Sequence, residues 1–427
     1  MQGCATPVPS PGAKAVTDRL VPVGPSPWRL DFGDLALRDL LRQIDLGSLD
    51  IKIAMARLDR ADAEVAAARA LSRPQVEIGV NGAVGGHSLS EQAAAGSPSL
   101  TATYELDIWG RVARARDALE HERRAVDSEV VVARRLVGAE AAQAYFTLRA
   151  AQSLTDILDS RRRDAQRLVD LTRARYAAGR ASRDEVSSRT QAVADLEAEL
   201  TAARLEARIE TLRLGALLGK TTNPIIPRAS SSPWAFPSNA PFSSETVTAR
   251  PDVAAAYARL KAADSRRAEA VAASRPRFVL SASLGAADPS VINLLDAKSL
   301  VWAVAAEVSQ SIADGGARKA RIGSASAEVD LADLAYRKAV VQAWADARRA
   351  LAQVTAADAD LARADARRLA ANEQVAIVRR RHEAGAADAL DILGAQDGIA
   401  TAEIRVNAAR LRATSARIGL ALAAPGA

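Results

Sequence analysis

A long internal repeat is the sequence feature that most constrains the fold of this 427-residue chain. A Ser-Arg-Pro tripeptide at residues 72–74 recurs at residues 274–276, a separation of 202 residues. Solenoid and propeller units are only about 20 to 50 residues long. The separation therefore indicates two copies of one domain-sized unit. A second motif recurs after 206 residues, with Arg175, Tyr176 and Gly179 in the first copy and Arg381, His382 and Gly385 in the second.

Proline placement predicts that each copy is mostly helical. The chain holds 17 prolines, yet residues 99–223 and 290–424 contain none. An interior proline removes a backbone donor and clashes with the preceding turn, so such long proline-free spans are typical of helices. Gly179 and Gly385 each lie in a short turn of small residues, where a positive φ can end one helix before the next begins. We therefore expect a helical hairpin in each copy.

The expected helix lengths describe a long helical cylinder. Residues 110–176 and 316–382 would each form a helix of roughly 100 Å at 1.5 Å per residue. Two shorter helices placed end to end would nearly match one long helix, and we pair 183–219 with 252–274, and a carboxy-terminal helix from about Ala387 with 50–72. The chain then divides into an amino-terminal segment, a first repeat, a proline-rich equatorial linker and a second repeat, at residues 1–33, 34–219, 220–250 and 251–424.

Between its short and long helix, each copy carries two stretches with the period-two alternation of a strand that has one apolar face. Each stretch is about ten residues long, the length that a tilted strand needs to cross a bilayer. Polar linkers over residues 82–97 and 286–299 have the composition of solvent-exposed loops. The apolar positions are Val76, Ile78 and Val80, then Tyr104, Leu106 and Ile108, then Phe278, Leu280, Ala282 and Leu284, and finally Trp302, Val304, Ala306 and Val308.

Four strands in one chain cannot form a closed membrane barrel. The smallest such barrels have about eight strands, and lipid tolerates no open sheet edge. If these strands lie in a membrane, the chain must therefore assemble with copies of itself into a ring. The alternative is a small soluble sheet packed on a coiled coil.

Several motifs resemble those of TolC-type outer-membrane factors. Residues 104–111 look like the strand-to-helix motif of that family, and residues 314–318 look like its partner in the second repeat. Residues 250–253 resemble the opening of the second short helix, and the two turn motifs are similar to the periplasmic tips. The match extends from about Trp28 to Leu422. The strand-to-helix resemblance is carried by Tyr104, Asp107, Trp109 and Gly110 in the first repeat and by Gly315 and Gly316 in the second.

The resemblance implies a mainly α fold with some β structure, in which three chains form a periplasmic α-barrel of helical hairpins and a twelve-stranded transmembrane β-barrel. It implies a passive exit duct of the bacterial outer membrane that meets a periplasmic adaptor and an inner-membrane pump of the RND type, and that exports small toxic compounds or drugs. In such a duct Gln75, Glu77, Glu105 and Asp107 would face a wet lumen. Two alternatives stay open, the outer-membrane component of a type I protein secretion system and a soluble structural coiled coil.

Cys4 is the only cysteine, and it suggests the lipoprotein branch of efflux outer-membrane factors, the OprM-like group. Gly3-Cys4 followed by small and polar residues resembles the end of a bacterial lipobox, whose cysteine is acylated after signal cleavage. A signal needs a charged segment and an apolar run, and only three residues precede Cys4 in this sequence. We expect a lipid anchor at Cys4. The alternative is an ordinary thiol in a terminal tail.

The two turn motifs would form both the adaptor-docking surface and the gate. Family members often carry an acidic residue three positions after the one matched by Asp391, whereas this chain has Gly394 there, so we expect one carboxylate ring to be absent. Leu390 and Asp391 are the gate candidates, with Arg175 as an electrostatic latch to a neighbouring helix. The alternative is that these residues only shape two tight turns. The docking candidates are Arg175, Tyr176, Gly179, Arg381, His382 and Gly385.

Composition and motifs argue against catalysis and nucleic-acid binding. The 57 Lys and Arg exceed the 51 Asp and Glu by six, and the arginines are dispersed along amphipathic helices. Aromatic residues make up 4% of the chain, without a stacking cluster. His87, His121 and His382 have no paired spacing that would indicate a metal site. We therefore expect no metal, no cofactor, no enzyme activity and no nucleic-acid partner.

Overall fold

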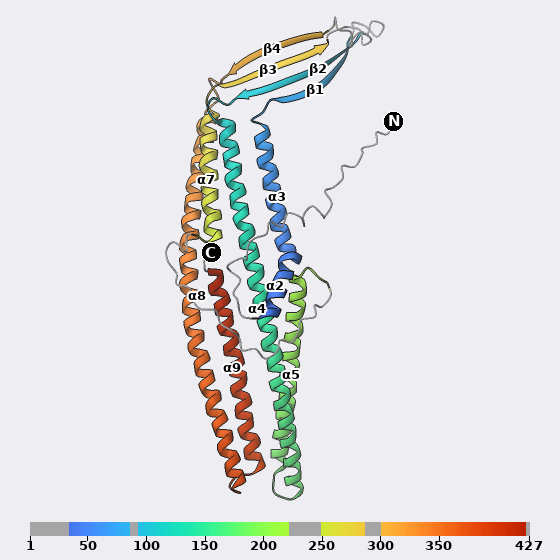
Figure 1. Ribbon diagram of the computed structural model, residues 1–427, viewed down its shortest axis with the longest axis vertical. Helices are drawn as coiled ribbons and strands as arrows, with labels where there is room; N and C mark the ends of the chain where they lie inside the picture. The colour runs from blue at the N-terminus through green and yellow to red at the C-terminus, as the bar shows by residue number, and fades with distance from the viewer. Residues whose placement is uncertain (1–33, 86–92, 222–248, 287–299, 424–427) are drawn as a thin grey trace.

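The computed structural model describes residues 34–85, 93–221, 249–286 and 300–423. Its longest elements are α4 (Arg111–Ala177) and α8 (Ala317–Glu383), two helices of 67 residues each. Figure 1 shows a sheet at one end of the molecule and the turns of two helical hairpins at the other. The other elements are α2 (Leu35–Gly47), α3 (Leu49–Ala70), β1 (Gln75–Gly85), β2 (Ala93–Leu106), α5 (Arg183–Leu217), α7 (Pro251–Ala272), β3 (Arg277–Ala286), β4 (Leu300–Ser309) and α9 (Ala389–Ala423).

Corresponding helices of the two repeats have the same length. Helices α5 and α9 have 35 residues each, and α3 and α7 have 22 each. The duplicated helical hairpins that the sequence predicted are therefore confirmed. The segment 1–33 with Cys4 and most of the linker 220–250 lie outside the described residues, and the boundaries of the repeats stay a prediction.

The short helices do not meet end to end in the pairs that we expected. The expected pairs were α5 with α7 and α9 with α3. Instead, α5 ends against the junction of α2 and α3, where a Cβ on Gly219 would lie 2.8 Å from the carbonyl oxygen of Gly47. Arg250, just before α7, donates to the carbonyl oxygen of Ala423 at the end of α9 at 3.5 Å. Either pairing joins a 35-residue helix to a 22-residue helix, so helix length alone could not distinguish them.

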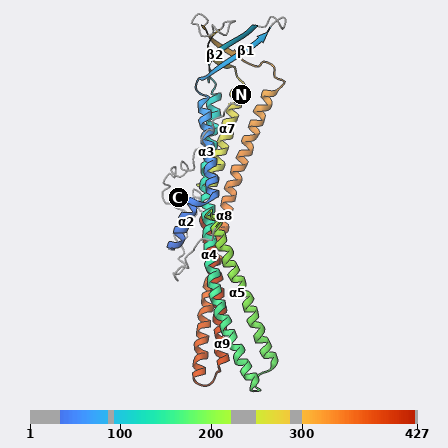
Figure 2. The ribbon, with the colours of Figure 1, turned by 90° about the vertical axis from the view of Figure 1, so that its right-hand side faces the viewer.

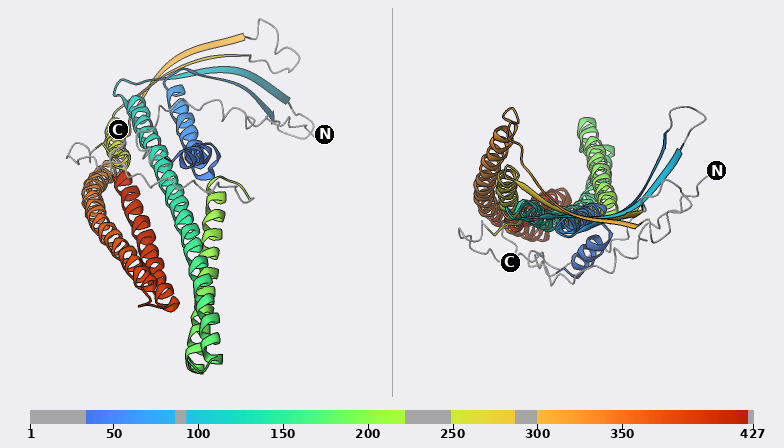
Figure 3. Two further views of the ribbon diagram at one scale, coloured as in Figure 1. Left: turned by 60° about the horizontal axis from the view of Figure 1, so that its bottom comes forward. Right: turned by 90° about the horizontal axis from the view of Figure 1, so that it is seen from above.

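The helices form a curved wall. In the half next to the sheet, the neighbours follow the order α3, α4, α7, α8, and in the other half the order is α5, α4, α9, α8. Seen from above in Figure 3, the wall is an open arc. Figure 2 shows the α4–α5 hairpin and the α8–α9 hairpin spreading apart toward their tips. In both halves α8 is one edge of the arc, and α3 or α5 is the other.

The sheet has the antiparallel order β1-β2-β3-β4. We expected a loop over residues 82–97, but the pairing of β1 with β2 continues from Gln75 opposite Thr103 to Gly85 opposite Ala93. Much of this extension is glycine and alanine, whose small side chains give little alternating signal. Strand β2 ends at Leu106, so Ile108 follows the strand instead of belonging to it.

The largest buried side chains lie near the middle of the wall. Tyr145 and Phe146 of α4 are 0% and 1% exposed, and they pack in one cluster with residues of α2, α5 and α9. Asp34 caps α2 and also accepts hydrogen bonds from the Tyr145 hydroxyl and the Arg149 guanidinium, each at 2.8 Å. Burial, together with the Asp34 carboxylate, raises the pKa of Tyr145. Helix α2, which this contact holds on α4, was not predicted from the sequence.

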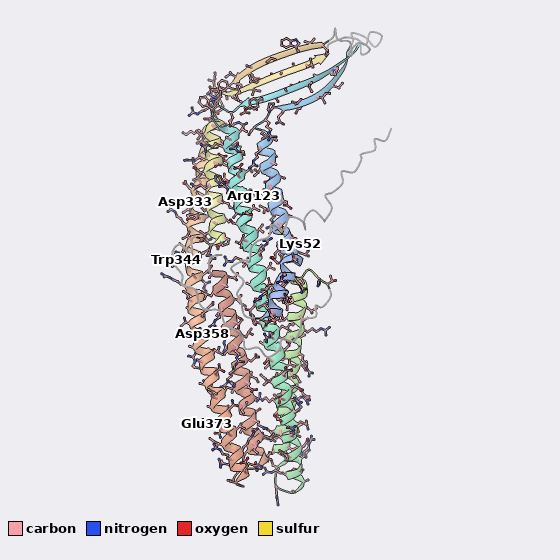
Figure 4. The ribbon with its side chains drawn as sticks, in the orientation of Figure 1. Lys52, Arg123, Asp333, Trp344, Asp358 and Glu373 are labelled. Atoms are coloured by element: carbon pink, nitrogen blue, oxygen red, sulfur yellow. The ribbon has the colours of Figure 1, made fainter. Side chains whose placement is uncertain are left out.

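Alanine-rich seams and ion pairs join the remaining helices. Buried alanines at 347, 350, 413 and 416 let α8 and α9 approach closely. Across two other contacts, Arg123 of α4 pairs with Asp62 of α3, and Asp358 of α8 pairs with Arg417 of α9, each at 2.7 Å; Figure 4 labels Arg123 and Asp358. Within the described ranges, none of the helices combines the length and the apolar character that crossing a membrane requires.

Candidate functional site

The four-stranded sheet has two chemically different faces. One row across all four strands consists of Ile78, Leu100, Leu284 and Trp302, which are paired in register. The neighbouring row on the same face is Val76, Ala102, Ala282 and Val304. On the opposite face the corresponding rows are polar or small. They are Gln75, Thr103, Ser281 and Ala305, then Glu77, Thr101, Ser283 and Ala303.

The apolar face of the sheet is exposed in the single chain. Ile78 is 80% exposed, Trp302 is 75% exposed and Val304 is 71% exposed. A soluble protein would bury such a continuous apolar surface, because exposed patches of this kind mark contact with another surface or with lipid. An apolar face and a polar face on the same antiparallel strands are what a membrane strand with a wet interior needs.

The turn between β2 and α4 is fixed by two acidic side chains. The Asp107 carboxylate accepts the amide N–H groups of Val112 and Ala113 at 3.0 and 2.8 Å, so it caps the first turn of α4. Glu105 accepts from Arg111 and from Arg277 of β3, each at 2.8 Å. The expectation that both carboxylates face a wet lumen stays a prediction, and within the single chain both make local contacts. Asp107 follows the strand and holds the helix start, and the Glu105 side chain is only 12% exposed.

Trp109 ties the two repeats together at this junction. Its indole N–H donates to the carbonyl oxygen of Pro276 at 2.9 Å, and the Arg275 guanidinium lies 4.9 Å from its ring. Both partners belong to the second copy of the Ser-Arg-Pro motif. The bond and the cation–π contact thus join the turn before α4 to the second copy of the tripeptide.

Glycines in the left-handed region allow both long helices to begin directly after the sheet. Gly110 has a φ of 76° and Gly316 has a φ of 93°, and each is the residue before its helix. Gly315, which also has a positive φ of 63°, precedes Gly316. Asp314 accepts the amide of Arg318 at 3.0 Å and its guanidinium at 2.8 Å, and these bonds lower the pKa of the Asp314 carboxyl.

The two tips have the same backbone. Gly179 and Gly385 have φ angles of 73° and 71°. In each tip, the glycine amide donates to the carbonyl three residues back at 2.9 Å, and the next amide donates to the carbonyl five residues back at 2.7 Å. This pair of hydrogen bonds is a Schellman cap, which needs a residue that tolerates positive φ. The carbonyls that accept these bonds belong to Arg175, Tyr176, Arg381 and His382.

The side chains of the second tip form a network that the sequence did not reveal. Asp388 and Asp391 cap α9 reciprocally, since each carboxylate accepts the amide N–H of the other residue, at 3.0 and 2.8 Å. The Arg175 guanidinium lies 3.5 Å from the Asp388 carboxylate, so the ion pair joins the two tips. The predicted latch residue thus pairs with Asp388, which we had not singled out, whereas Asp391 is bonded within its own turn. His382 Nδ1 lies 2.7 Å from the carbonyl oxygen of Ala387.

A groove of about 450 Å³ lies between α8 and α9 beside the second tip. Arg381 and Asp391 line it, together with Gly394 and Gly398, which add no side-chain volume. The expected gate residue Leu390 is half-buried, and Tyr176 is half-exposed at the other tip. The glycine that replaces an acidic residue of the family pattern therefore lies at the wall of a groove.

Two buried arginines bind the carboxy-terminal end of α9 near the middle of the wall. Arg135 of α4, 4% exposed, donates to the carbonyl oxygens of Ala421 and Leu422 at 2.8 and 3.2 Å. Arg250, 8% exposed, pairs with Asp252 at 2.7 Å. Burial lowers the pKa of Arg135, and the nearby charge of Arg250 lowers it further. The resemblance had marked Arg250, but Arg135 lies among many helix arginines and gave no sequence signal.

The sequence matches known proteins along most of its length. The family model described as outer membrane efflux protein matches residues 40–220 and 243–425. The chain is 27% identical over 410 residues to the pyoverdine export outer membrane protein OpmQ of Pseudomonas aeruginosa, an alignment that covers 92% of this chain and 85% of the relative. It is 28% identical over 392 residues to outer membrane protein OprJ of the same species, with 86% and 79% covered.

Solved structures share the fold across almost the whole chain. A membrane protein from Pseudomonas aeruginosa superposes with a TM-score of 0.84 at 25% identity, covering 93% of this chain and 95% of the other. The outer-membrane channel OprN superposes with a TM-score of 0.83 at 23% identity, covering 94% and 92%. Since the family model spans both repeats, and the two-faced sheet, the long hairpins and the capped tips all lie within that fold, the chain belongs to the outer membrane efflux protein family.

Proposed function

We propose that three copies of this chain form a passive exit duct, with a twelve-stranded barrel in the outer membrane and a helical tunnel in the periplasm. The observation that carries the proposal is the sheet, which has an exposed apolar face, a polar face and two open edges, β1 and β4. Lipid tolerates no open edge. Pairing β4 with β1 of the next copy removes both edges and encloses the polar face.

The edges of the helical wall support the same assembly. Helix α8 carries Leu334 and Val341, more than half exposed, on the side away from α7 and α9. The opposite edges carry Ile53 of α3 and Leu205 and Leu212 of α5, also more than half exposed. Ala345, Ala352, Ala359 and Ala366 recur on α8 every seven residues and are exposed. A second copy, with α3 and α5 placed against α8, would bury both apolar edges through close helix contact.

The tips are the proposed contact with a periplasmic adaptor, and through it with an inner-membrane pump of the RND type. They are the ends farthest from the sheet, and they present charged side chains and a groove. Small exported compounds are favoured over polypeptides, because relatives are named for the export or efflux of pyoverdine, toluene and antibiotics. The duct itself would have no catalytic role. Adjacent genes for a pump or for a secretion ATPase would separate the two export classes.

The closed state of the duct would be held by contacts between α4 and α9. Arg175 pairs with Asp388 at the tips, and Arg161 pairs with Asp397 through two bonds of 2.5 and 3.2 Å further along the same helices. Breaking these pairs would let the two hairpins spread. Asp391 and Leu390 would then act through the turn that positions α9, and Arg175 through its pair with Asp388.

Cys4 is the proposed lipid anchor of the assembled duct. Replacing Cys4 with Ser should remove acyl chains from the mature protein while the barrel still inserts. Mass spectrometry of the amino-terminal peptide from native membranes measures the acylation. An unacylated peptide from the wild-type protein would refute the anchor and leave the duct untouched.

Two adjacent residues of β4 provide a direct test of the barrel. Val304 lies on the apolar face and Ala305 on the polar face. In liposomes, Val304→Cys should react with a lipid-soluble thiol reagent and resist a water-soluble one, and Ala305→Cys should do the reverse. Cys4 would be a second cysteine in each variant. Both variants are therefore made in a Cys4→Ser background. Equal reaction of both positions with the water-soluble reagent would contradict a membrane barrel.

A further inference from the structure

A cavity of about 430 Å³ lies between α4 and α8, where the end of α9 meets the start of α7. It is separate from the sheet and from the tips. Gly419 of α9 contributes no side chain to its wall, and a Cβ added there would meet no atom within 4 Å. The volume is in the range of sites that hold small organic molecules.

The cavity opens on the concave face of the helical wall. Tyr145 of α4 packs in one cluster with residues of α2, and Figure 3 shows α2 on the convex side of the arc. A helix turns by about 100° per residue, so Leu136 lies about 180° around α4 from Tyr145. Leu136 lines the cavity and is 54% exposed. In the proposed duct, the concave face encloses the tunnel.

A neighbouring copy would not cover the cavity. The alanines of α8 proposed for contact between copies include Ala345 and Ala352. Asp346 and Gln353, which line the cavity, each follow one of these alanines and therefore lie about 100° further around the helix. Three copies would place three open cavities around the tunnel.

Arginines give the cavity a positive character. Arg135 and Arg250 line it, although they are only 4% and 8% exposed. Asp252 pairs with Arg250 at 2.7 Å, and Asp346 lies 3.7 Å from Arg250 and 3.3 Å from Arg349. The lining thus holds three arginines against two aspartates. Burial lowers the pKa of Arg135, and the charge of Arg250 lowers it by more than the charge of Asp252 raises it.

Apolar side chains form the rest of the wall, among them Leu136 of α4 and Leu422 of α9. They would contact an apolar body, while the surplus positive charge favours an anionic group and disfavours a cation. Arg349 is the most accessible of the three arginines, because its side chain is 68% exposed. An exposed ion pair contributes little, so Arg349 can turn from Asp346 to a bound anion at a small cost.

We propose that this cavity binds amphipathic organic anions, with a carboxylate at the arginines and an apolar body against Leu136 and Leu422. Its role as a contact for solutes inside the tunnel rests on the proposed duct. Binding itself does not, because every residue of the lining belongs to one chain.

Binding of naphthaleneacetate to the full chain in nanodiscs tests the proposal, with empty nanodiscs as the background. The neutral naphthaleneacetamide has the same apolar body, so the comparison isolates the carboxylate. Titration calorimetry should show saturable binding of the acid and at least about fivefold weaker binding of the amide. Binding of the acid should also weaken as KCl rises toward about 1 M, where the screening length falls to about 3 Å.

Two neighbouring arginines of α8 show whether the charge acts at the cavity. Arg349→Gln removes a cation from the lining and should weaken binding of the acid at least about fivefold. Arg348→Gln makes the same change in charge at a residue that does not line the cavity. Arg348 instead lies 5.7 Å from the ring of Trp344, which Figure 4 labels, and its replacement should leave binding unchanged.

Two glycine substitutions test the cavity itself. Gly419→Leu should fill it and weaken the acid and the amide alike. Gly323→Leu, at a glycine of α8 with equally open surroundings, should weaken neither.

Four outcomes would overturn the site. They are no saturable binding of the acid, equal binding of the amide, wild-type affinity in both Arg349→Gln and Gly419→Leu, and an equal loss in Arg348→Gln. Each would leave the duct standing if the same sample contains trimers. Saturable binding with the expected pattern in a sample without trimers would instead refute the duct and retain the site.

Discussion

The two repeats of this chain have matching helices and tip turns, although most of their side chains differ. A shift of 206 residues superimposes the bounds of α4 on α8, of α5 on α9, and of one tip glycine on the other. Yet Trp109 corresponds to Gly315, buried Glu210 to buried Ala416, and Ser182 to Asp388. The shared positions are those where the backbone needs a particular φ or a close approach. Trp109 and Asp388 contact the other repeat, whereas Glu210 is buried within its own, so changing each of them tests what the difference does.

The largest effect is expected at Trp109, which has no counterpart in the second repeat. Trp109→Ala removes the bond to the Pro276 carbonyl and the contact with Arg275, and should destabilise the junction by about 3 kcal/mol. Hydrogen exchange should rise in residues 107–112 and 275–277. Trp109→Phe keeps an aromatic ring without the N–H and should lose less. Equal protection in all three proteins would mean that the junction does not depend on this contact.

Substitution of the tip glycines should affect both repeats equally. Gly179→Val and Gly385→Val each force a β-branched residue to a φ above 70°, at a cost of about 2 kcal/mol. The strain should appear as faster hydrogen exchange at the affected tip alone, and as weaker binding of an adaptor. Apart from its chain neighbours, a Cβ added at either glycine would meet no atom within 4 Å, so the effect arises from φ and not from a clash. A loss at only one tip would break the equivalence of the two turns.

Glu210 should stabilise the protein when it is neutralised. Only 6% of this residue is exposed, and one carboxylate oxygen has no hydrogen-bond partner among the described residues. Burial raises the pKa of the Glu210 carboxyl; Arg213 lowers it, and Glu206 and Glu140 raise it further. Because the folded-state pKa lies above the unfolded value, ionisation destabilises the fold as the pH rises from the unfolded pKa through the folded one.

Glu210→Gln should therefore raise the free energy of unfolding by about 1 kcal/mol at pH 7. The gain should vanish as the pH falls below the unfolded value, where the wild-type carboxyl is protonated in both states. Thermal unfolding at pH 4 and pH 7 measures the difference. Glu206→Gln, an exposed change one turn away, is the matched control and should gain less. A gain that is independent of pH would mean that charge is not the cause.

The smallest effect on stability is expected at Asp388. Asp388→Ser gives the second tip the cap of the first, where the Ser182 hydroxyl accepts the amide of Glu185 at 3.1 Å. The substitution keeps a helix cap and loses the partly exposed ion pair with Arg175. The free energy of unfolding should therefore change by less than about 1 kcal/mol. Single-channel conductance should nevertheless rise if this pair holds the tips together. Arg175→Ala should give the same rise, and Asp391→Ala combined with it should add little. An opening caused only by a Leu390 substitution would show that the constriction is apolar.

The repeated motifs made much of this fold predictable from the sequence. Helices α4 and α8 and the two tips follow from glycines and proline-free spans, and the faces of the strands follow from alternation at Val76 to Val80 and Trp302 to Val308. Helix α2 was missed, because it is short and held by Asp34, Tyr145 and Arg149, which are far apart in sequence. The end-to-end order of the short helices depends on long-range contacts within each repeat, and the pair of Arg175 with Asp388 is a contact between the repeats; no local pattern encodes either.

The central claim is that one chain is an incomplete part of a closed ring, and the mass of the purified oligomer tests it most directly. The chain has a mass of 44.9 kDa, so native mass spectrometry of the detergent-purified protein should give three times that value before any acyl chains are added. Hydrogen exchange on the same sample should protect the edge strands β1 and β4 as well as β2 and β3. A monomer in which all four strands are equally protected would contradict the account, because the sheet would then satisfy its edges without a second copy.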